Sequence, residues 1–333
     1  MLIGVWARVH LRVFSRRDLN GVVKWVMLFR QLEYFVALAR ERHFARAASA
    51  CYVSQPALSE AIRKLEHELG VPLVWRGHNY EGLTPEGERL VLWARRILAE
   101  HDSLKHEVAA LQTGLTGRLR LGVIPAASGT VALLTDPFCA EHPLVNVHLE
   151  TSLRSTEIVD RIRRFELDAG LLYPDDQDVS DVLVHPLYEE QHVLVANGEL
   201  VAGYADTISW SDALELPMCL LNEGMRGRQL IDAALAAHDL KLTPRLETDS
   251  FVSLLAHVGT GRWACIIPQT WLRTLRPPAG ARVLRLEAPS LRASIALVTS
   301  AAEPGPVLAR ALRRTAQNAD VAGTLGAALP QDE

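Results

Sequence analysis

The sequence predicts a chain of two parts: an all-α winged helix-turn-helix unit that continues into one long helix, and a C-terminal α/β domain of two lobes. Three observations lead to this fold class. Apolar residues recur at helical spacing between residues 28 and 69, and turn signals interrupt them. A helix start at Pro85 is followed by no strong break before Gly114. From residue 118, short strand patterns alternate with helical ones, as in a mixed or parallel sheet covered by helices.

The helix-turn-helix prediction rests on three helices joined by tight turns. Two are expected at 28–39 and 44–50. The third begins at Ser54, whose hydroxyl is a preferred N-cap, has Pro56 just inside, and ends at Gly70. The apolar stripe of the first helix is Leu28, Leu32, Phe35, Val36 and Ala39, and that of the third is Leu58, Ile62, Leu65 and Leu69. A three-helix core without any partner has the same pattern, so spacing alone leaves that alternative open.

A hairpin and a long helix follow. Two short extended pieces flank residues 77–79, which predicts a wing. Thr84 and Pro85 then start a helix over 85–113. Its narrow apolar seam consists of Leu90, Ala94, Ile97, His101, Leu104, Val108 and Leu111. The seam favours a coiled-coil dimer, although packing against the helix's own domain also explains it. Residues 114–117 are expected to form a hinge.

The α/β part is expected to span 118–318. Strands are predicted at 119–123, 145–149, 169–173, 193–195, 218–221 and 264–267, and helices at 131–139, 158–165, 227–238 and 251–258. This length is sufficient for two similar lobes. We expect lobe I at 118–188 and 290–318, lobe II at 189–289, and a C-terminal tail at 319–333.

Composition is that of a globular protein, but the charge is uneven. The chain has 333 residues, of which 49% are apolar and 22% charged, and it contains no apolar run long enough to span a membrane. Its net charge of −4 conceals three blocks: +4 over residues 1–26, 0 over 27–113 and −8 over 114–333. The acidity therefore belongs to the C-terminal two-thirds and does not argue against nucleic-acid binding by the first third.

Cysteine spacing and the first residues give further expectations. The four cysteines stand at 51, 139, 219 and 265 and form no CxxC pair, so we expect neither a zinc site nor disulfides. Scattered thiols of this kind suit a reducing cytoplasm. We also expect no cofactor. Residues 1–26 lack the apolar core and cleavage site of a secretory signal. They form an extension of doubtful status: either a misassigned start ahead of Met27 or an ordered basic arm.

Many of these positions together match one known family. They include Gln31, Phe35, Ala47, Ala48, the run from Val53 through Ser54, Gln55, Pro56, Ala57 and Leu58 to Ser59, and then Leu69, Gly70, Arg76, Thr84 and Gly87. Their spacing resembles that of the LysR-type transcriptional regulators over residues 27–318. The resemblance implies a winged helix-turn-helix at 27–84 that binds double-stranded DNA, and a dimerising linker helix at 85–113. It also implies a periplasmic-binding-protein-like effector domain, a homotetramer, and contact with RNA polymerase if the protein is an activator.

The resemblance directs attention to the start of the third helix. Short polar side chains there can enter the major groove and bond base edges, and arginines nearby can hold phosphates. The candidate DNA-binding residues are Arg46, Ser54, Gln55, Pro56, Ser59, Arg63 and Arg76. Glu60 departs from the family, which often has a basic residue at that position. Because residues 27–84 carry a net charge of only +1, we expect a shallow salt dependence of DNA binding.

The family's ligand lies between the lobes, near helix N-termini that favour small anions. The positions that correspond here are Ala126, Ser128, Thr130, Ser155, Asn222, Met225, Arg226 and Ser250. Each Ser or Thr also suits a plain helix cap, and Ala126 replaces a frequent hydroxyl residue. Arg226 and Arg228 are the expected counter-charges, unless both are ordinary surface arginines. The predicted effector is a small carboxylate or similar oxyanion.

Two other classes of protein are less compatible with the sequence. A two-lobed transport protein would need a secretion signal and no DNA-binding domain. An enzyme would need a readable catalytic constellation, and the motifs GxGxxG, GxxxxGK[ST], HExxH and GxSxG are missing. The sequence therefore predicts a regulator that binds DNA and is switched by a non-covalent effector, and it names neither the effector nor the regulated genes.

Overall fold

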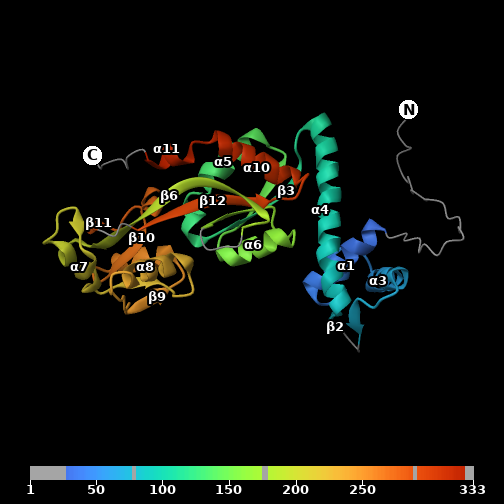
Figure 1. Ribbon diagram of the computed structural model, residues 1–333, viewed down its shortest axis with the longest axis horizontal. Coiled ribbons are helices and arrows are strands. Elements are labelled where there is room, and N and C mark those ends of the chain that lie inside the picture. The colour runs from blue at the N-terminus through green and yellow to red at the C-terminus, as the bar shows by residue number, and fades with distance from the viewer. Residues whose placement is uncertain (1–27, 77–79, 175–178, 288–290, 327–333) are drawn as a thin grey trace, which may run out of the picture. The chain divides into compact units, whose positions relative to one another are not determined.

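The computed structural model describes residues 28–76, 80–174, 179–287 and 291–326 (Figure 1). The extension at 1–26, the tip of the hairpin and the last residues of the predicted tail lie outside these ranges. The chain divides into two compact units, Met1–Val91 and Leu92–Glu333, which are described separately.

The N-terminal unit has the predicted helix-turn-helix. It consists of α1 (Phe29–Glu41), α2 (Phe44–Ala50), α3 (Gln55–Leu69), the antiparallel pair β1 (Val74–Arg76) and β2 (Tyr80–Leu83), and the start of α4 (Pro85–Thr113). The Ser54 hydroxyl accepts a hydrogen bond from the Ala57 N–H (3.3 Å), and Gly70 ends α3 at a φ of 71°. Both local predictions for α3 are therefore confirmed, because cap and stop residues act within a few positions of themselves.

The predicted stripe of α1 is partly wrong. Leu28 precedes the helix and is half exposed, and Val36 is only partly buried. Leu32 and Phe35 are buried as predicted, and Tyr34 and Leu38, which the stripe omitted, are buried as well. The reason is that α1 packs against both α2 and α3, so its buried surface is wider than a single stripe.

Helix α4 spans 29 residues and begins as predicted. The Thr84 hydroxyl accepts from the Gly87 N–H (2.9 Å) and donates to the Pro72 carbonyl (2.7 Å). Along the predicted seam Ala94 is buried, whereas Leu104, Val108 and Leu111 are 62%, 51% and 85% exposed. No helix among the described residues has the length and apolarity that a bilayer span requires.

The first lobe of the C-terminal unit contains a parallel arrangement of β3 (Gly117–Val123), β4 (Val145–Glu150) and β5 (Ala169–Leu172). The antiparallel strand β12 (Arg292–Ser300) joins them. The accompanying helices are η1 (Pro125–Gly129), α5 (Ala132–Glu141), α6 (Ser155–Arg163), α10 (Val307–Asn318) and α11 (Val321–Gly326). α11 lies inside the segment predicted as a tail, so that prediction is corrected: Val321 is buried in the core of this lobe.

The second lobe continues the same eight-stranded sheet, whose main order is β4-β3-β5-β12-β6-β11-β7, with β10 also paired to β6. Its strands are β7 (Thr207–Ile208), β8 (Cys219–Leu221), β9 (Leu246–Thr248), β10 (Ala264–Pro268) and β11 (Ala281–Leu286). Its helices are η2 (Gly198–Val201), α7 (Trp210–Leu214), α8 (Arg226–Ala236), α9 (Phe251–Val258) and η3 (Gln269–Arg273). β8 and β9 form a separate two-stranded parallel sheet.

Strand β6 (Val182–Asn197) connects the two lobes and is far longer than the predicted strand at 193–195. Its first part pairs with β12, and its second part pairs with β10 and β11. The predicted lobe boundary after residue 188 therefore falls inside one continuous strand. Pro186, which sits in the paired region beside a register shift, hides the first part from sequence patterns, since proline normally argues against a strand interior.

Candidate functional sites

The first candidate site is the start of α3. Gln55, Ser59 and Arg63 follow one another at intervals of four, so they share one helix face. Gln55 and Arg63 are exposed and Ser59 is half-buried, whereas Leu58 and Ile62 are buried on the neighbouring face. Ser54 and Pro56 are exposed at the first turn. α3 is therefore held by its apolar face and presents the predicted polar set outward.

Arg63 is already engaged. It donates to a Glu60 carboxylate oxygen (2.7 Å) and to the Ser59 hydroxyl (3.4 Å). Glu60, the departure noted in the sequence, thus neutralises the arginine that was expected to hold DNA. A phosphate or base must compete with this carboxylate, which reduces the electrostatic contribution to DNA binding.

The remaining arginine candidates are placed differently. Arg46 on α2 is 63% exposed and donates to the Glu41 carbonyl (2.6 Å). Arg76 ends β1, and its side chain lies outside the part of the chain that the structure describes. The structure adds Tyr52, which sequence analysis did not single out. This residue is 96% exposed in the turn before α3, at a φ of 55°, and nothing in the residue pattern marks it as special.

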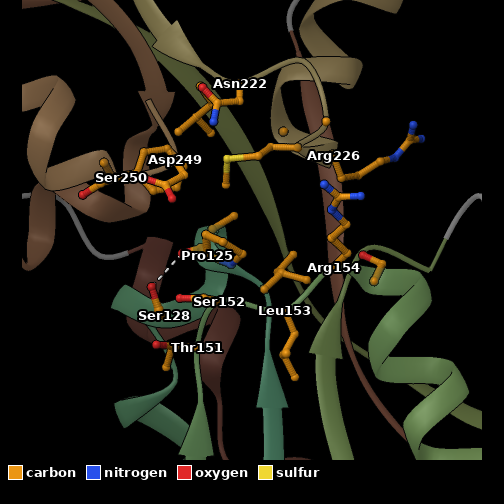
Figure 2. A pocket seen from close by; sticks show the side chains of 18 of the residues that line it. Pro125, Ser128, Thr151, Ser152, Leu153, Arg154, Asn222, Arg226, Asp249 and Ser250 are labelled. Atoms are coloured by element: carbon orange, nitrogen blue, oxygen red, sulfur yellow. Dashed lines mark hydrogen bonds between the residues drawn. The ribbon is translucent and has the colours of Figure 1, made fainter. Parts of the chain in front are cut away.

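The second candidate site is a cavity of about 480 Å³ between the lobes of the C-terminal unit (Figure 2). Seven of the eight predicted effector positions line it: Ala126, Ser128, Ser155, Asn222, Met225, Arg226 and Ser250. Thr130 does not line it. Its hydroxyl is buried and makes hydrogen bonds to the Tyr188 hydroxyl (2.6 Å) and the Ala127 carbonyl (3.1 Å), because η1 turns this side chain into the core.

The helix starts around the cavity fall into two kinds. At α9, Ser250 is a plain cap whose hydroxyl accepts from the Ser253 N–H (3.3 Å), and Ser128 donates to the Pro125 carbonyl (2.6 Å). Within the described ranges, α6 and α8 have no side-chain cap. Ser155, only 3% exposed, stands inside the first turn of α6, and its hydroxyl has no partner among the described residues. The N-terminal amides of these two helices are therefore open to a ligand, and the buried Ser155 hydroxyl lies beside one of them without a partner of its own.

Among the residues that the structure describes, three charged ones line the cavity: Arg154, Arg226 and Asp249. Figure 2 shows the two arginines close together at one end, with Asp249 at the other end near Ser128 and Ser250. Asp249 lies beside Ser250 in a loop that the family resemblance already mapped to the effector site. Sequence analysis missed Arg154, because it precedes a helix as an ordinary polar residue and only the fold turns it toward the cavity.

The expectation for Arg228 is corrected. Its side chain is 2% exposed and donates to Asp232 (2.9 Å), Glu247 (2.8 Å) and the Leu221 carbonyl (3.0 Å). It is neither a counter-charge for an effector nor a surface arginine. It ties α8 to β8 and β9.

A buried polar pair lies directly behind the cavity wall. Tyr173, which lines the cavity, donates its hydroxyl to Glu190 (2.6 Å) on the strand that joins the lobes. Glu190 is completely buried, and burial raises the pKa of its carboxyl to about 7, against a smaller opposing effect of the Tyr173 hydrogen bond. Burial lowers the pKa of His192, two residues further along the strand, to about 4.

Glu190→Gln is expected to stabilise the C-terminal unit at pH 8 and to change little at pH 5. Between pH 4.5 and pH 7 the unfolded chain loses the Glu190 proton while the folded chain keeps it, so this group makes stability fall as pH rises through that window. Glutamine has no proton to lose, so its advantage should grow by about 3 kcal/mol from pH 5 to pH 8. Urea denaturation at both pH values measures the difference, with exposed Glu189→Gln as the control. An advantage equal at both pH values would contradict this assignment.

Comparison with known proteins identifies the family. Residues 29–88 match the model of the bacterial regulatory helix-turn-helix protein, lysR family, and residues 112–320 match the LysR substrate binding domain. A probable hydrogen peroxide-inducible genes activator of Streptomyces viridosporus is 33% identical over 302 residues, which is 87% of this chain and 95% of that protein. The regulator EstR of Acinetobacter baylyi is 32% identical, over 74% of this chain and 81% of its own length.

Solved structures agree with this fold. A full-length OxyR variant from Pseudomonas aeruginosa has a TM-score of 0.72 at 26% identity, and covers 91% of this chain and 99% of its own. CbnR in complex with its target DNA has a TM-score of 0.62 at 21% identity, over 88% of this chain and all of its own. The two family models together match most of the sequence, so the chain belongs to the LysR family of transcriptional regulators, which bind DNA and an effector and are not enzymes.

Proposed function

We propose that this regulator reads its operator with α3 and is switched by a small carboxylate or similar oxyanion held between the lobes. One observation carries the effector proposal: the uncapped N-termini of α6 and α8 open into the same cavity as Arg154 and Arg226. Helix N-terminal amides and guanidinium groups are strong donors to an anion. The cavity volume suits a small molecule.

Calorimetric titration of the full chain with a panel of small carboxylates, dicarboxylates and inorganic phosphate tests this proposal. We expect Arg226→Ala to weaken binding of any compound that binds by at least about tenfold, the scale of one charge-assisted hydrogen bond. Arg164→Ala, an exposed arginine at the other end of α6, is the matched control and should leave affinity unchanged. Equal affinities for wild type and Arg226→Ala would contradict an anion site at α8.

On the DNA side, Gln55, Ser59 and Arg63 form the proposed base-reading face, with Arg46, Ser54, Pro56 and Arg76 supporting contact with the duplex. Gln55→Ala should weaken binding to an operator selected from a random duplex library by about 10- to 100-fold, the value of one bidentate contact to adenine. His67→Ala, an exposed change near the end of α3, is the control. Fluorescence anisotropy measures both, and a loss of less than threefold for Gln55→Ala would remove this residue from the interface.

We propose that α4 dimerises through its seam. Leu104, Val108 and Leu111 are exposed at heptad spacing in the single chain, and such a stripe is expected to pair with its copy. Val108→Glu should halve the mass of the assembly measured by light scattering, because it places two carboxylates in the seam. Lys105→Glu, exposed one position off the seam region, should leave the mass unchanged. A Val108→Glu protein of unchanged mass would place the dimer contact elsewhere.

Two dimers that each form through the α4 seam, joined through their effector domains, would build the expected tetramer. In each dimer the two winged domains would contact half-sites related by a two-fold axis. Residues 114–117 remain the proposed hinge: Gly114 and Gly117 have φ values of 93° and 121°, which favour glycine. Under this proposal the protein works in the cytoplasm and contacts RNA polymerase if it activates transcription. Footprinting with and without effector tests the hinge through the protected length.

A further inference from the structure

We infer that the effector is dipolar, with an anionic group at the end of the cavity near Arg154 and Arg226 and a protonated amine at the end near Asp249. This inference rests on the proposed anion site and adds the second charge. Arg154 and Asp249 line the same cavity, and neither makes an ion pair or hydrogen bond within the described residues.

Arg154 is exposed and has no acid partner within the described residues. Several other arginines of the unit are neutralised by acids, as in the pairs Arg120 with Asp168 (2.6 Å), Arg161 with Glu150 (2.8 Å), and Arg163 with Asp181 (2.8 Å). The unit is acidic overall, so carboxylates are plentiful. What distinguishes Arg154 is that it lines the cavity without an acid partner, so its charge is available to an external anion there.

The anion end is built from both lobes. The guanidinium of Arg154, from the first lobe, lies across the loop before α8 in the second lobe. Its Nη2 atom is 3.1 Å from the position that a Cβ on Gly224 would occupy. The buried hydroxyl of Ser155 and the open first turn of α6 adjoin it. A carboxylate placed here receives donors from both lobes, which favours their closed arrangement.

The other end has the chemistry of a cation site. Asp249 is not needed as a helix cap, because Ser250 already caps α9. The Ser128 hydroxyl donates its hydrogen to the Pro125 carbonyl, so the Ser128 oxygen can still accept a hydrogen bond. Figure 2 shows Ser128 on the same side of the cavity as Asp249. Trp271, also in the lining, is fixed by its bond to the Ala126 carbonyl (3.0 Å) and stacks on Phe251 with ring centroids 4.7 Å apart. A carboxylate, an acceptor oxygen and an aromatic ring together suit an ammonium group.

The two ends are not close enough to satisfy each other, since Arg154 and Asp249 form no ion pair. A ligand with only negative charge would leave Asp249 unneutralised and would be repelled by it if it filled the cavity. A zwitterion of the amino-acid class neutralises both ends at once. The uncompensated charges at the two ends thus select against plain dicarboxylates of the same size.

The test is a titration of the full chain with matched pairs that differ only by the amine: each common L-amino acid and γ-aminobutyrate against the corresponding deaminated acid. We expect at least one amine-bearing acid to bind at least tenfold more tightly than its partner. Asp249→Asn should abolish that preference while retaining binding of the deaminated acid, and Arg154→Ala should weaken both. Arg164→Ala should change neither.

The outcomes separate the two proposals. Deaminated acids that bind as well as or better than their amine-bearing partners overturn the dipolar inference and leave the anion site intact. A preference for the amine that survives Asp249→Asn also overturns it. Binding that survives both Arg154→Ala and Arg226→Ala overturns the proposed anion site itself, and a panel in which no amine-bearing acid binds counts against the dipolar effector. Because Asp249 is exposed, its replacement should leave thermal unfolding unchanged, which checks that the variant is folded.

Discussion

Replacing Gly87 by alanine is expected to destabilise the winged helix-turn-helix strongly and to weaken DNA binding with it. A Cβ at this position would stand 2.1 Å from the carbonyl oxygen of Leu73. The carbonyl belongs to the backbone and the Cβ position is fixed by the backbone, so no rotamer change relieves the clash. The strain at α4's capped first turn should cost at least about 3 kcal/mol and lower the Tm of this small unit by more than about 10 °C.

Circular dichroism during heating of the full chain measures this effect, and the C-terminal unit serves as an internal reference whose transition should not move. Gly203→Ala is the matched control: apart from its chain neighbours, no atom of the described residues lies within 4 Å of the added Cβ, so the Tm should stay within about 1 °C. If Gly87→Ala kept both the Tm and the DNA affinity of wild type, the close approach of α4 to Leu73 would be wrong.

The N-terminal unit was predictable because its signals are local. Ser54, Gly70 and Thr84 each fix a helix end through a hydrogen bond or a φ value within a few residues. The first part of β6 was not predictable, because it exists through pairing with β12, more than 100 residues away in sequence. Such pairing overrides local propensity, and Pro186 obscures it further.

The same distinction explains the effector cavity. Most of its predicted positions are helix starts, which sequence patterns and the family resemblance both mark. What each polar group does there depends on distant partners. Thr130 points into the core, where it is hydrogen-bonded to the Tyr188 hydroxyl. Arg228 donates to the carboxylate of Glu247, which is 19 residues away in sequence. Whether a charge is free for a ligand is therefore a property of the fold and cannot be read from composition.

Arg228→Met is expected to destabilise the C-terminal unit by about 2–4 kcal/mol, the second large effect. It leaves Asp232 and Glu247 without their common partner and the Leu221 carbonyl without its donor. The two acids are partly exposed, so water compensates them in part. The lost interactions matter here because the sheet of β8 and β9 is small. The two strands pair over only three residues each, and Arg228 joins both strands to α8. A decrease in Tm of about 5–10 °C should appear in the transition of this unit.

Arg226→Met is the matched comparison. It is the same substitution two positions away, and it should affect anion binding rather than stability. Residues two apart on a helix point to nearly opposite sides, so Arg228 enters the core while Arg226 lines the cavity. Arg226→Met should therefore keep the Tm within about 2 °C and lose affinity for anions. The reverse result would exchange the two roles. In that case Arg228→Met would be stable but would no longer bind anions, and Arg226→Met would be unstable but would still bind them. Of two equally charged arginines, the buried one maintains the site and the half-exposed one lines the cavity where the ligand is proposed to bind.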